Sequence, residues 1–204
     1  MSAPWTTGPG RACRLPDPTP ETAPETAAAF ARVAASRGWV SNLLTSLGHA
    51  PEALARFSAL GHYGRYGTDL SERQRELVIV IVGRNITYAW AHHAPLALDC
   101  GVTEAELAAI KAGRTPAGLD AADQALCDFV FAFTSFGGVP EPAWQAVSHS
   151  FTTRQATDIA MLAAYYLAAG SLIVGLGVQV EPPTILAIER DWQKRPRLGD
   201  QVVA

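Results

Sequence analysis

Four side chains that could transfer protons or donate hydrogen bonds lie close together in the sequence: Glu76, Tyr88, His92 and His93. Carboxylates and imidazoles are the groups that enzymes most often use as general acids and bases near neutral pH. Glu76 directly precedes an apolar run, residues 77–82, where a carboxylate is costly unless it has a partner. If this protein is an enzyme, we therefore expect its chemistry to be carried out here.

A helix is expected to begin at Ser71 and to carry Glu76. Ser71 is a favourable N-cap, and Glu72 places a negative charge in the first turn, where it interacts well with free backbone N–H groups. The apolar run 77–82 could by itself be a buried strand. The charged lead-in favours a helix whose later turns are buried on all sides.

A break in this helix is required if Glu76 and His93 are to share a substrate. In a continuous helix they would lie about 25 Å apart at a rise of 1.5 Å per residue. Poor helix formers between residues 83 and 87 predict a break there, with Thr87 as the N-cap of a second helix that folds back. On that helix His92 and His93 must point to different sides.

Three short segments of the sequence stand out, R-E-L-V-I-V at 75–80, Y-A-W-A-H-H-A-P at 88–95 and G-V-T-E at 101–104. Together they resemble the carboxymuconolactone decarboxylase family, which also includes AhpD-like alkylhydroperoxidases. The resemblance extends from about residue 40 to residue 183, and the matching positions of the family's acid and histidine are Glu76 and His93. It implies an all-α, AhpD-like helical domain that acts without a cofactor and assembles as a homo-oligomer, a trimer or a hexamer.

Two positions depart from the family pattern. The C-x-x-C pair of the alkylhydroperoxidases falls on Ile86 and Ala89, so a dithiol mechanism lacks its nucleophile. Ala89 also stands where the family usually has a glutamate. A relative with a different substrate, for example in secondary metabolism, is therefore expected as readily as the decarboxylase itself.

The expected function is that of a cofactor-free lyase or isomerase acting on a small carboxylated lactone or a similar enolisable substrate. His93 would carry the proton, and Glu76 would orient its ring. Tyr88 or His92 would donate a hydrogen bond to the developing oxyanion. The candidate substrate-binding residues are Trp90 and Arg84.

Two other function classes stay open. One is an alkylhydroperoxidase-like oxidoreductase, which would need a thiol pair. The other is a non-catalytic helical scaffold or ligand-binding protein, in which Glu76 and His93 are only a buried polar pair. No metal site is expected, because the adjacent His92 and His93 lack the i, i+4 spacing with which two rings hold one ion.

Composition argues against several kinds of partner. A net charge of −3 and a pI of about 5.9 provide no electrostatic footprint for nucleic acid or for an acidic membrane. Three widely spaced cysteines match neither a disulfide framework nor a metal motif, so a cytoplasmic location is expected. The uncharged segment 159–180 is long enough to cross a bilayer, but its acidic flanks favour a buried helix that also packs against another subunit.

The chain is expected to form one helical domain over residues 23–190. A flexible, proline-rich tail (1–22) precedes it, and a C-terminal tail (191–204) follows. Thr103 and Glu106 should form a capping box. Besides the helix that follows Thr87, the expected helices cover residues 24–35, 40–47, 51–63, 71–82, 103–112, 119–136, 142–150 and 153–174.

Overall fold

A computed structural model describes residues 11–19 and 21–193, and every regular element in these ranges is an α-helix. The predicted all-α class is therefore confirmed. Every predicted helix occurs, and the predicted ends are displaced by no more than three residues. The helices are α1 (Thr26–Arg37), α2 (Asn42–Ser46), α3 (Pro51–Tyr66), α4 (Glu72–Gly83), α5 (Thr87–Asp99), α6 (Glu104–Lys111), α7 (Ala121–Phe133), α8 (Glu141–Ser150), α9 (Thr153–Leu176) and α10 (Pro183–Gln193).

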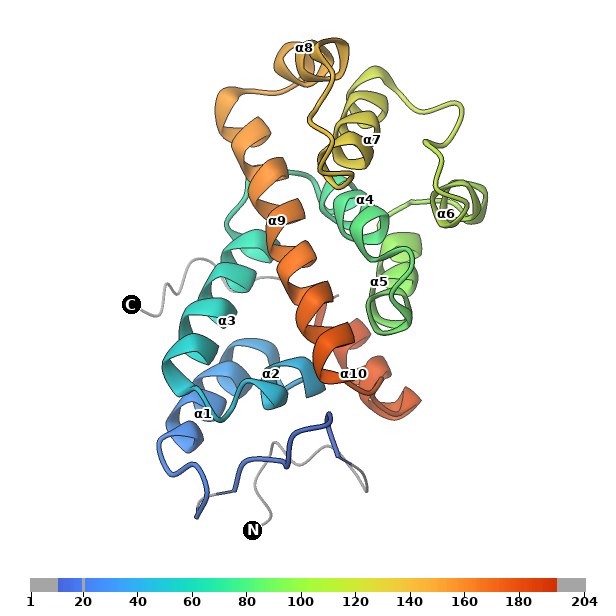
Figure 1. Cartoon of the computed structure of the whole chain (residues 1–204). Coiled ribbons are helices and arrows are strands. Elements are labelled where there is room, and N and C mark those ends of the chain that lie inside the picture. The colour runs from blue at the N-terminus through green and yellow to red at the C-terminus, as the bar shows by residue number, and fades with distance from the viewer. Residues whose placement is uncertain (1–10, 20, 194–204) are drawn as a thin grey trace.

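Helix α9 runs through the middle of the molecule, with α1 to α3 on one side and α4 to α8 on the other (Figure 1). It packs most closely on α4 and also touches α2, α3, α7 and α8. By length and composition alone α9 could span a membrane, which is weak evidence because a central core helix has the same properties. Its contacts are those of a central packing helix.

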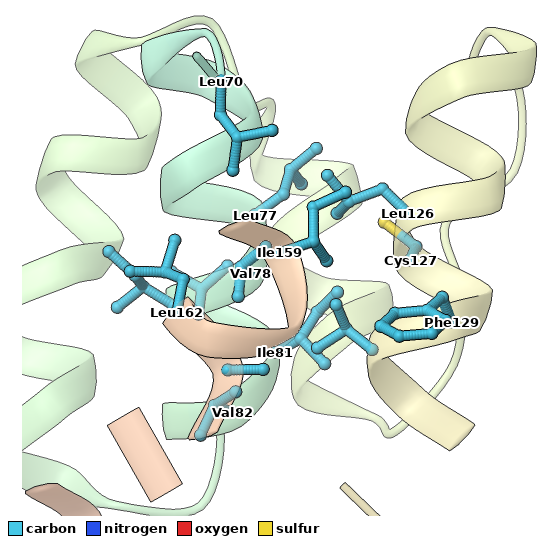
Figure 2. Close-up of a cluster of buried hydrophobic side chains, with 14 of the residues drawn as sticks. Leu70, Leu77, Val78, Ile81, Val82, Leu126, Cys127, Phe129, Ile159 and Leu162 are labelled. Atoms are coloured by element: carbon cyan, nitrogen blue, oxygen red, sulfur yellow. The ribbon is translucent and has the colours of Figure 1, made fainter. Parts of the chain in front are cut away.

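The main hydrophobic core joins α4, α7 and α9. Helix α4 is buried on all sides from Leu77 to Val82, where no residue is more than 8% exposed. This confirms the prediction of a helix with fully buried later turns. Figure 2 shows the facing side chains, which are Leu77, Val78 and Ile81 of α4, Leu126 and Phe129 of α7, and Ile159 and Leu162 of α9.

The predicted caps are correct at two helices and wrong at a third. Ser71 and Thr103 each accept a hydrogen bond from the backbone N–H three residues on, and both complete a capping box. Thr87 does not cap α5. Ile86 occupies the N-cap position with an extended backbone, and Thr87 is the first helical residue. The chain is extended there because the Ile86 side chain packs against α9 beside Gly170.

Two segments expected to be tails belong in part to the packed structure. Backbone hydrogen bonds of 2.9 Å join the N–H of Arg14 to the carbonyl of Leu176, and the N–H of Gln179 to the carbonyl of Ala12. This part of the expected tail therefore contacts the end of α9, and its flexibility stays a prediction. Helix α10 was not predicted, and it crosses the expected domain end at residue 190. Residues 1–10, 20 and 194–204 of the expected tails lie outside the described residues.

The reversal between α4 and α5 brings the two helices unusually close. Gly83 ends α4, and a Cβ atom at this position would lie 2.7 Å from the Cβ of Ala89 in α5. Only a residue without a side chain permits this approach. The predicted helix break is thus present, and its closeness depends on Gly83.

We expect Gly83→Ala to lower the free energy of unfolding by about 1–3 kcal/mol, because the new methyl group overpacks this contact. Gly175 in α9 is the matched control, since a Cβ there meets no atom within 4 Å. Gly175→Ala should raise stability by about 0.5–1 kcal/mol. Urea unfolding measures both changes. Equal effects at the two positions, or no recovery when Ala89→Gly is added to Gly83→Ala, would contradict the prediction.

Candidate active site

His93 and Glu76 meet in the interior of the protein, as the predicted reversal requires. Nδ1 of His93 lies 2.9 Å from Oε2 of Glu76, and the two residues are 7% and 6% exposed. We assign the hydrogen to Nδ1, because the carboxylate is an acceptor. Among the described residues, no hydrogen-bond partner reaches Nε2 of His93. The second ring nitrogen is therefore available to a ligand.

Arg65, in the last turn of α3, forms the third member of this cluster. Its Nη2 lies 3.7 Å from Oε1 of Glu76, and the residue is 8% exposed. Burial acts against its charge, but the nearby Tyr166 and Glu76 outweigh burial and keep the pKa of Arg65 above its ordinary value. Arg65 is therefore a buried cation. Sequence reasoning missed it, because nothing distinguishes it among the 16 basic residues.

His92 points to the other side of α5 and lies between two carboxylates. Its Nε2 is 2.7 Å from Oε2 of Glu181, and its Nδ1 is 2.5 Å from Oε2 of Glu189. Burial opposes a charged ring, but these hydrogen bonds outweigh it and raise the pKa of His92 to about 9. Burial also opposes ionisation of Glu189, yet the bond to His92 lowers the pKa of Glu189 to about 2. His92 is therefore an imidazolium that donates from both nitrogens.

Glu181 accepts further hydrogen bonds in this network. Besides His92, it accepts hydrogen bonds from the Tyr88 hydroxyl at 2.8 Å and from the backbone N–H of Asn42 at 2.6 Å. Burial, and then the charge of Glu181, raise the pKa of Tyr88 well above its ordinary value. The donors of Tyr88 and His92, both expected to bind an oxyanion, are thus engaged by glutamates. No sequence pattern linked Glu181 or Glu189 to them.

A cavity of about 70 Å³ separates the two histidine clusters. A buried water needs roughly 10–15 Å³ on this measure, so the space suits a small single-ring compound. Both histidines line it, from the α5 side. The other polar or aromatic lining residues are Trp39, Ser41, Arg65, Tyr66, Tyr88, Tyr165, Tyr166 and Glu189.

Ring contacts hold the cavity wall in place. Tyr88 stacks on His92 with the ring centroids 4.4 Å apart, and Trp39 lies parallel to the same imidazole at 6.0 Å. Tyr166 meets the His93 ring edge-on at 5.2 Å. An aromatic face beside an imidazolium is electrostatically favourable. The cavity therefore offers flat apolar walls beside charged groups.

Two predicted substrate-binding residues do not line this cavity. The Arg84 guanidinium lies over the ring of Phe131 at 5.2 Å, and Trp90 lies beneath the Lys111 ammonium at 4.4 Å. Their cation–π contacts account for both side chains within the fold. Ala89, at the position of the missing family glutamate, does line the cavity. An acid at position 89 would stand at the cavity wall.

Thiols are absent from the cavity wall. The three cysteines are free, and none of them lines the cavity. Burial raises the pKa of Cys100 to about 11 and that of Cys127 to about 12, so neither is an activated thiolate. Within residues 11–19 and 21–193, no group of three or more His, Cys, Asp or Glu side chains is arranged to hold a metal ion.

Part of the sequence matches a known protein family. The model of the carboxymuconolactone decarboxylase family matches residues 51–130, a range that includes Arg65, Glu76 and His93. No curated protein matches the chain.

Solved structures show the same fold at low sequence identity. An uncharacterized peroxidase-related protein from Ralstonia eutropha JMP134, with an alkylhydroperoxidase AhpD core, is 19% identical with a TM-score of 0.70, and the match covers 89% of this chain and 98% of that one. A peroxidase-related protein from Silicibacter sp. TM1040 is 21% identical (TM-score 0.70; 87% and 96% covered). A variant of the debrominase Bmp8 in complex with 2,3,4-tribromopyrrole is 16% identical (TM-score 0.66; 92% and 98% covered). The fold is therefore AhpD-like.

The pair formed by His92 and Glu189 predicts a pH-dependent contribution to stability. The folded pKa of His92, about 9, lies above its ordinary 6.5, so this contribution is complete below about pH 6.5 and is lost as the pH rises through 9. The folded pKa of Glu189, about 2, lies below 4.5, so its contribution is complete above pH 4.5 and is lost as the pH falls toward 2. Glu189→Gln should therefore destabilise most between pH 4.5 and 6.5, by about 1–3 kcal/mol.

Urea unfolding of wild type and Glu189→Gln across pH 3 to 10 tests this expectation. The matched control is Glu52→Gln in α3, which removes an exposed carboxylate whose ion pair with Arg56 lies in solvent. Its effect should be small and nearly independent of pH. A Glu189→Gln effect of constant size across the pH range would show that the pair does not contribute in this way.

Proposed function

We propose that the protein is a lyase or isomerase that transfers protons on a small carboxylated lactone or a similar enolisable substrate. The match of residues 51–130 to the carboxymuconolactone decarboxylase family model supports this proposal. The observation that carries the proposal is the state of the His93 ring. Glu76 holds one ring nitrogen, while the other has no partner among the described residues and the ring lines a cavity. This is the arrangement of an oriented general acid or base.

In a decarboxylation, the carbon–carbon bond to the substrate carboxylate breaks and carbon dioxide leaves. The bonding electron pair moves into the conjugated carbonyl, which becomes a dienolate. His93, protonated on both nitrogens, then delivers the Nε2 proton to carbon and later recovers a proton from water. Glu76 keeps accepting from Nδ1–H throughout and stabilises the charged ring.

An isomerisation would use the same pair with a neutral His93 at the start. Nε2 would take a proton from the carbon next to the carbonyl and return it to another carbon of the dienolate. Ala89 lines the cavity where the family usually has a glutamate. Because that acid is missing, the side chains present are compatible with decarboxylation and with isomerisation. The structure of Bmp8 with 2,3,4-tribromopyrrole supports the size of the substrate, because a substituted five-membered ring is bound on this fold.

The other function classes have less support. An alkylhydroperoxidase-like reaction needs a reactive thiol pair, and the cavity wall contains no cysteine. A purely structural pair of Glu76 and His93 would not need a cavity beside the free ring nitrogen. A binding protein without catalysis remains the alternative that the experiment below separates.

Assembly and location complete the proposal. We propose a homo-oligomer, a trimer or a hexamer, because α9 leaves small and apolar side chains such as Ala164, Ala168 and Val174 exposed. Burial of that surface against further subunits would be favourable. The free cysteines support a reducing, cytoplasmic location.

Release of carbon dioxide tests the proposal, with ultraviolet absorbance followed in parallel on carboxylated butenolides and β-keto acids. We expect wild type to act on at least one of them, and His93→Ala and Glu76→Gln to lower kcat by about 10²–10⁴-fold through loss of proton transfer. His149→Ala, which removes an exposed imidazole, is the control and should keep full activity. Size-exclusion chromatography should show the same assembly for all four proteins. Full turnover by His93→Ala would refute the assigned role.

A further inference from the structure

Arg65 is a buried cation whose guanidinium N–H groups have no hydrogen-bond acceptor among the described residues. Its contact with Glu76, at 3.7 Å, is longer than a hydrogen bond, and no described residue accepts a hydrogen bond from its guanidinium. The group carries five N–H donors in a planar fork. A charge that is buried without hydrogen bonds is costly. Arg65 can therefore donate hydrogen bonds to an oxygen ligand, an acceptor that the described part of the chain does not supply.

The guanidinium lines the same cavity as the His93 ring. One carboxylate connects them, because Oε1 of Glu76 faces Arg65 and Oε2 faces His93. Arg65 and the His93 ring are therefore held by the same carboxylate at the wall of one cavity. A ligand that contacts Arg65 would bring its neighbouring carbon atoms toward His93.

Two other donor residues at the cavity wall, His92 and Tyr88, are already engaged. Both nitrogens of His92 donate to glutamates, and the Tyr88 hydroxyl donates to Glu181. The charge of Glu189 is compensated by the imidazolium, and that of Glu76 is shared by its two partners. Among the described lining residues, Arg65 is the cation whose N–H groups have no hydrogen-bond acceptor.

We propose that Arg65 binds the anionic oxygen of the substrate, and that the cavity accepts a planar, conjugated oxyanion, either a carboxylate or an enolate. The aromatic walls fit a flat ring, and the volume of about 70 Å³ limits the ligand to a single small one. For the reaction, this inference rests on the proposed function. The electron pair of the broken bond places negative charge on the enolate oxygen. Arg65 would stabilise this oxyanion, a role that the sequence suggested for Tyr88 or His92.

Isothermal titration calorimetry with three single-ring probes tests the binding site without turnover. Tetronate is the enolate of a five-membered lactone, 2-furoate is a carboxylate, and 2-furamide is its neutral counterpart. Wild type should bind the anions at least about tenfold more tightly than the amide, because only an anion adds opposite charge and two acceptor lone pairs in an ion pair with the guanidinium. Tetronate should bind more tightly than 2-furoate if Arg65 serves the enolate oxygen. The reverse order would overturn the oxyanion role.

Variants on the same helix assign the effect to one side chain. Arg65→Met should weaken tetronate binding by about 100-fold, as removal of an oxyanion donor does, and should weaken 2-furamide binding much less. Arg65→Lys, which keeps the charge without the fork, should lie between. Arg56→Met, which removes an exposed arginine of α3, should bind as wild type. Equal tetronate binding by wild type and Arg65→Met would overturn the proposal.

These outcomes distinguish a failure of the inference from a failure of the proposed reaction. If anion binding depends on Arg65 but no protein shows turnover, the binding site is supported and the lyase or isomerase activity is refuted. If Arg65→Met turns over substrate as fast as wild type, the role of Arg65 is refuted and the proposed reaction is supported. Should Arg65→Met fail to fold, Arg65→Lys and the wild-type preference for anion over amide still decide, and an amide bound as tightly as 2-furoate overturns the proposal.

Discussion

The burial of Glu76 is the constraint on which the site depends. Its carboxylate lies at the end of the most completely buried part of α4, where removal from water is expensive unless opposite charge or hydrogen bonds replace the solvent. His93 from α5 and Arg65 from α3 provide this compensation. The same requirement orients the imidazole and holds a guanidinium at the cavity. The contacts that stabilise the buried carboxylate therefore also position the side chains of the site.

The second network extends this logic to the C-terminal part of the chain. His92 can remain charged in the interior because Glu181 and Glu189 both accept from its ring. Glu189 belongs to α10, which a bidentate ion pair between Arg190 and Asp99 also attaches to α5. Figure 1 shows α10 beside α5, at the C-terminal end of α9. One wall of the cavity is therefore complete only when this last helix is in place.

Much of the fold could be predicted because the signals are local. A cap joins residues three apart, so Ser71 and Thr103 identify their helices directly. The break before α5 follows from a cluster of poor helix formers, although tertiary packing of Ile86 moved the cap away from Thr87. Helix α10 was overlooked, and the docking of residues 11–19 depends on the end of α9. Both omissions concern segments whose position is decided by contacts with distant parts of the chain.

For the site, the sequence by itself determined that Glu76 and His93 could meet and that His92 must face elsewhere. These conclusions need only the helix period and one reversal over 17 residues. The partners of His92 lie 89 and 97 residues away along the chain, and Arg65 lies on a different helix. Only tertiary structure decided these partners, because the packing of helices, rather than any local spacing, selects which buried charges come together.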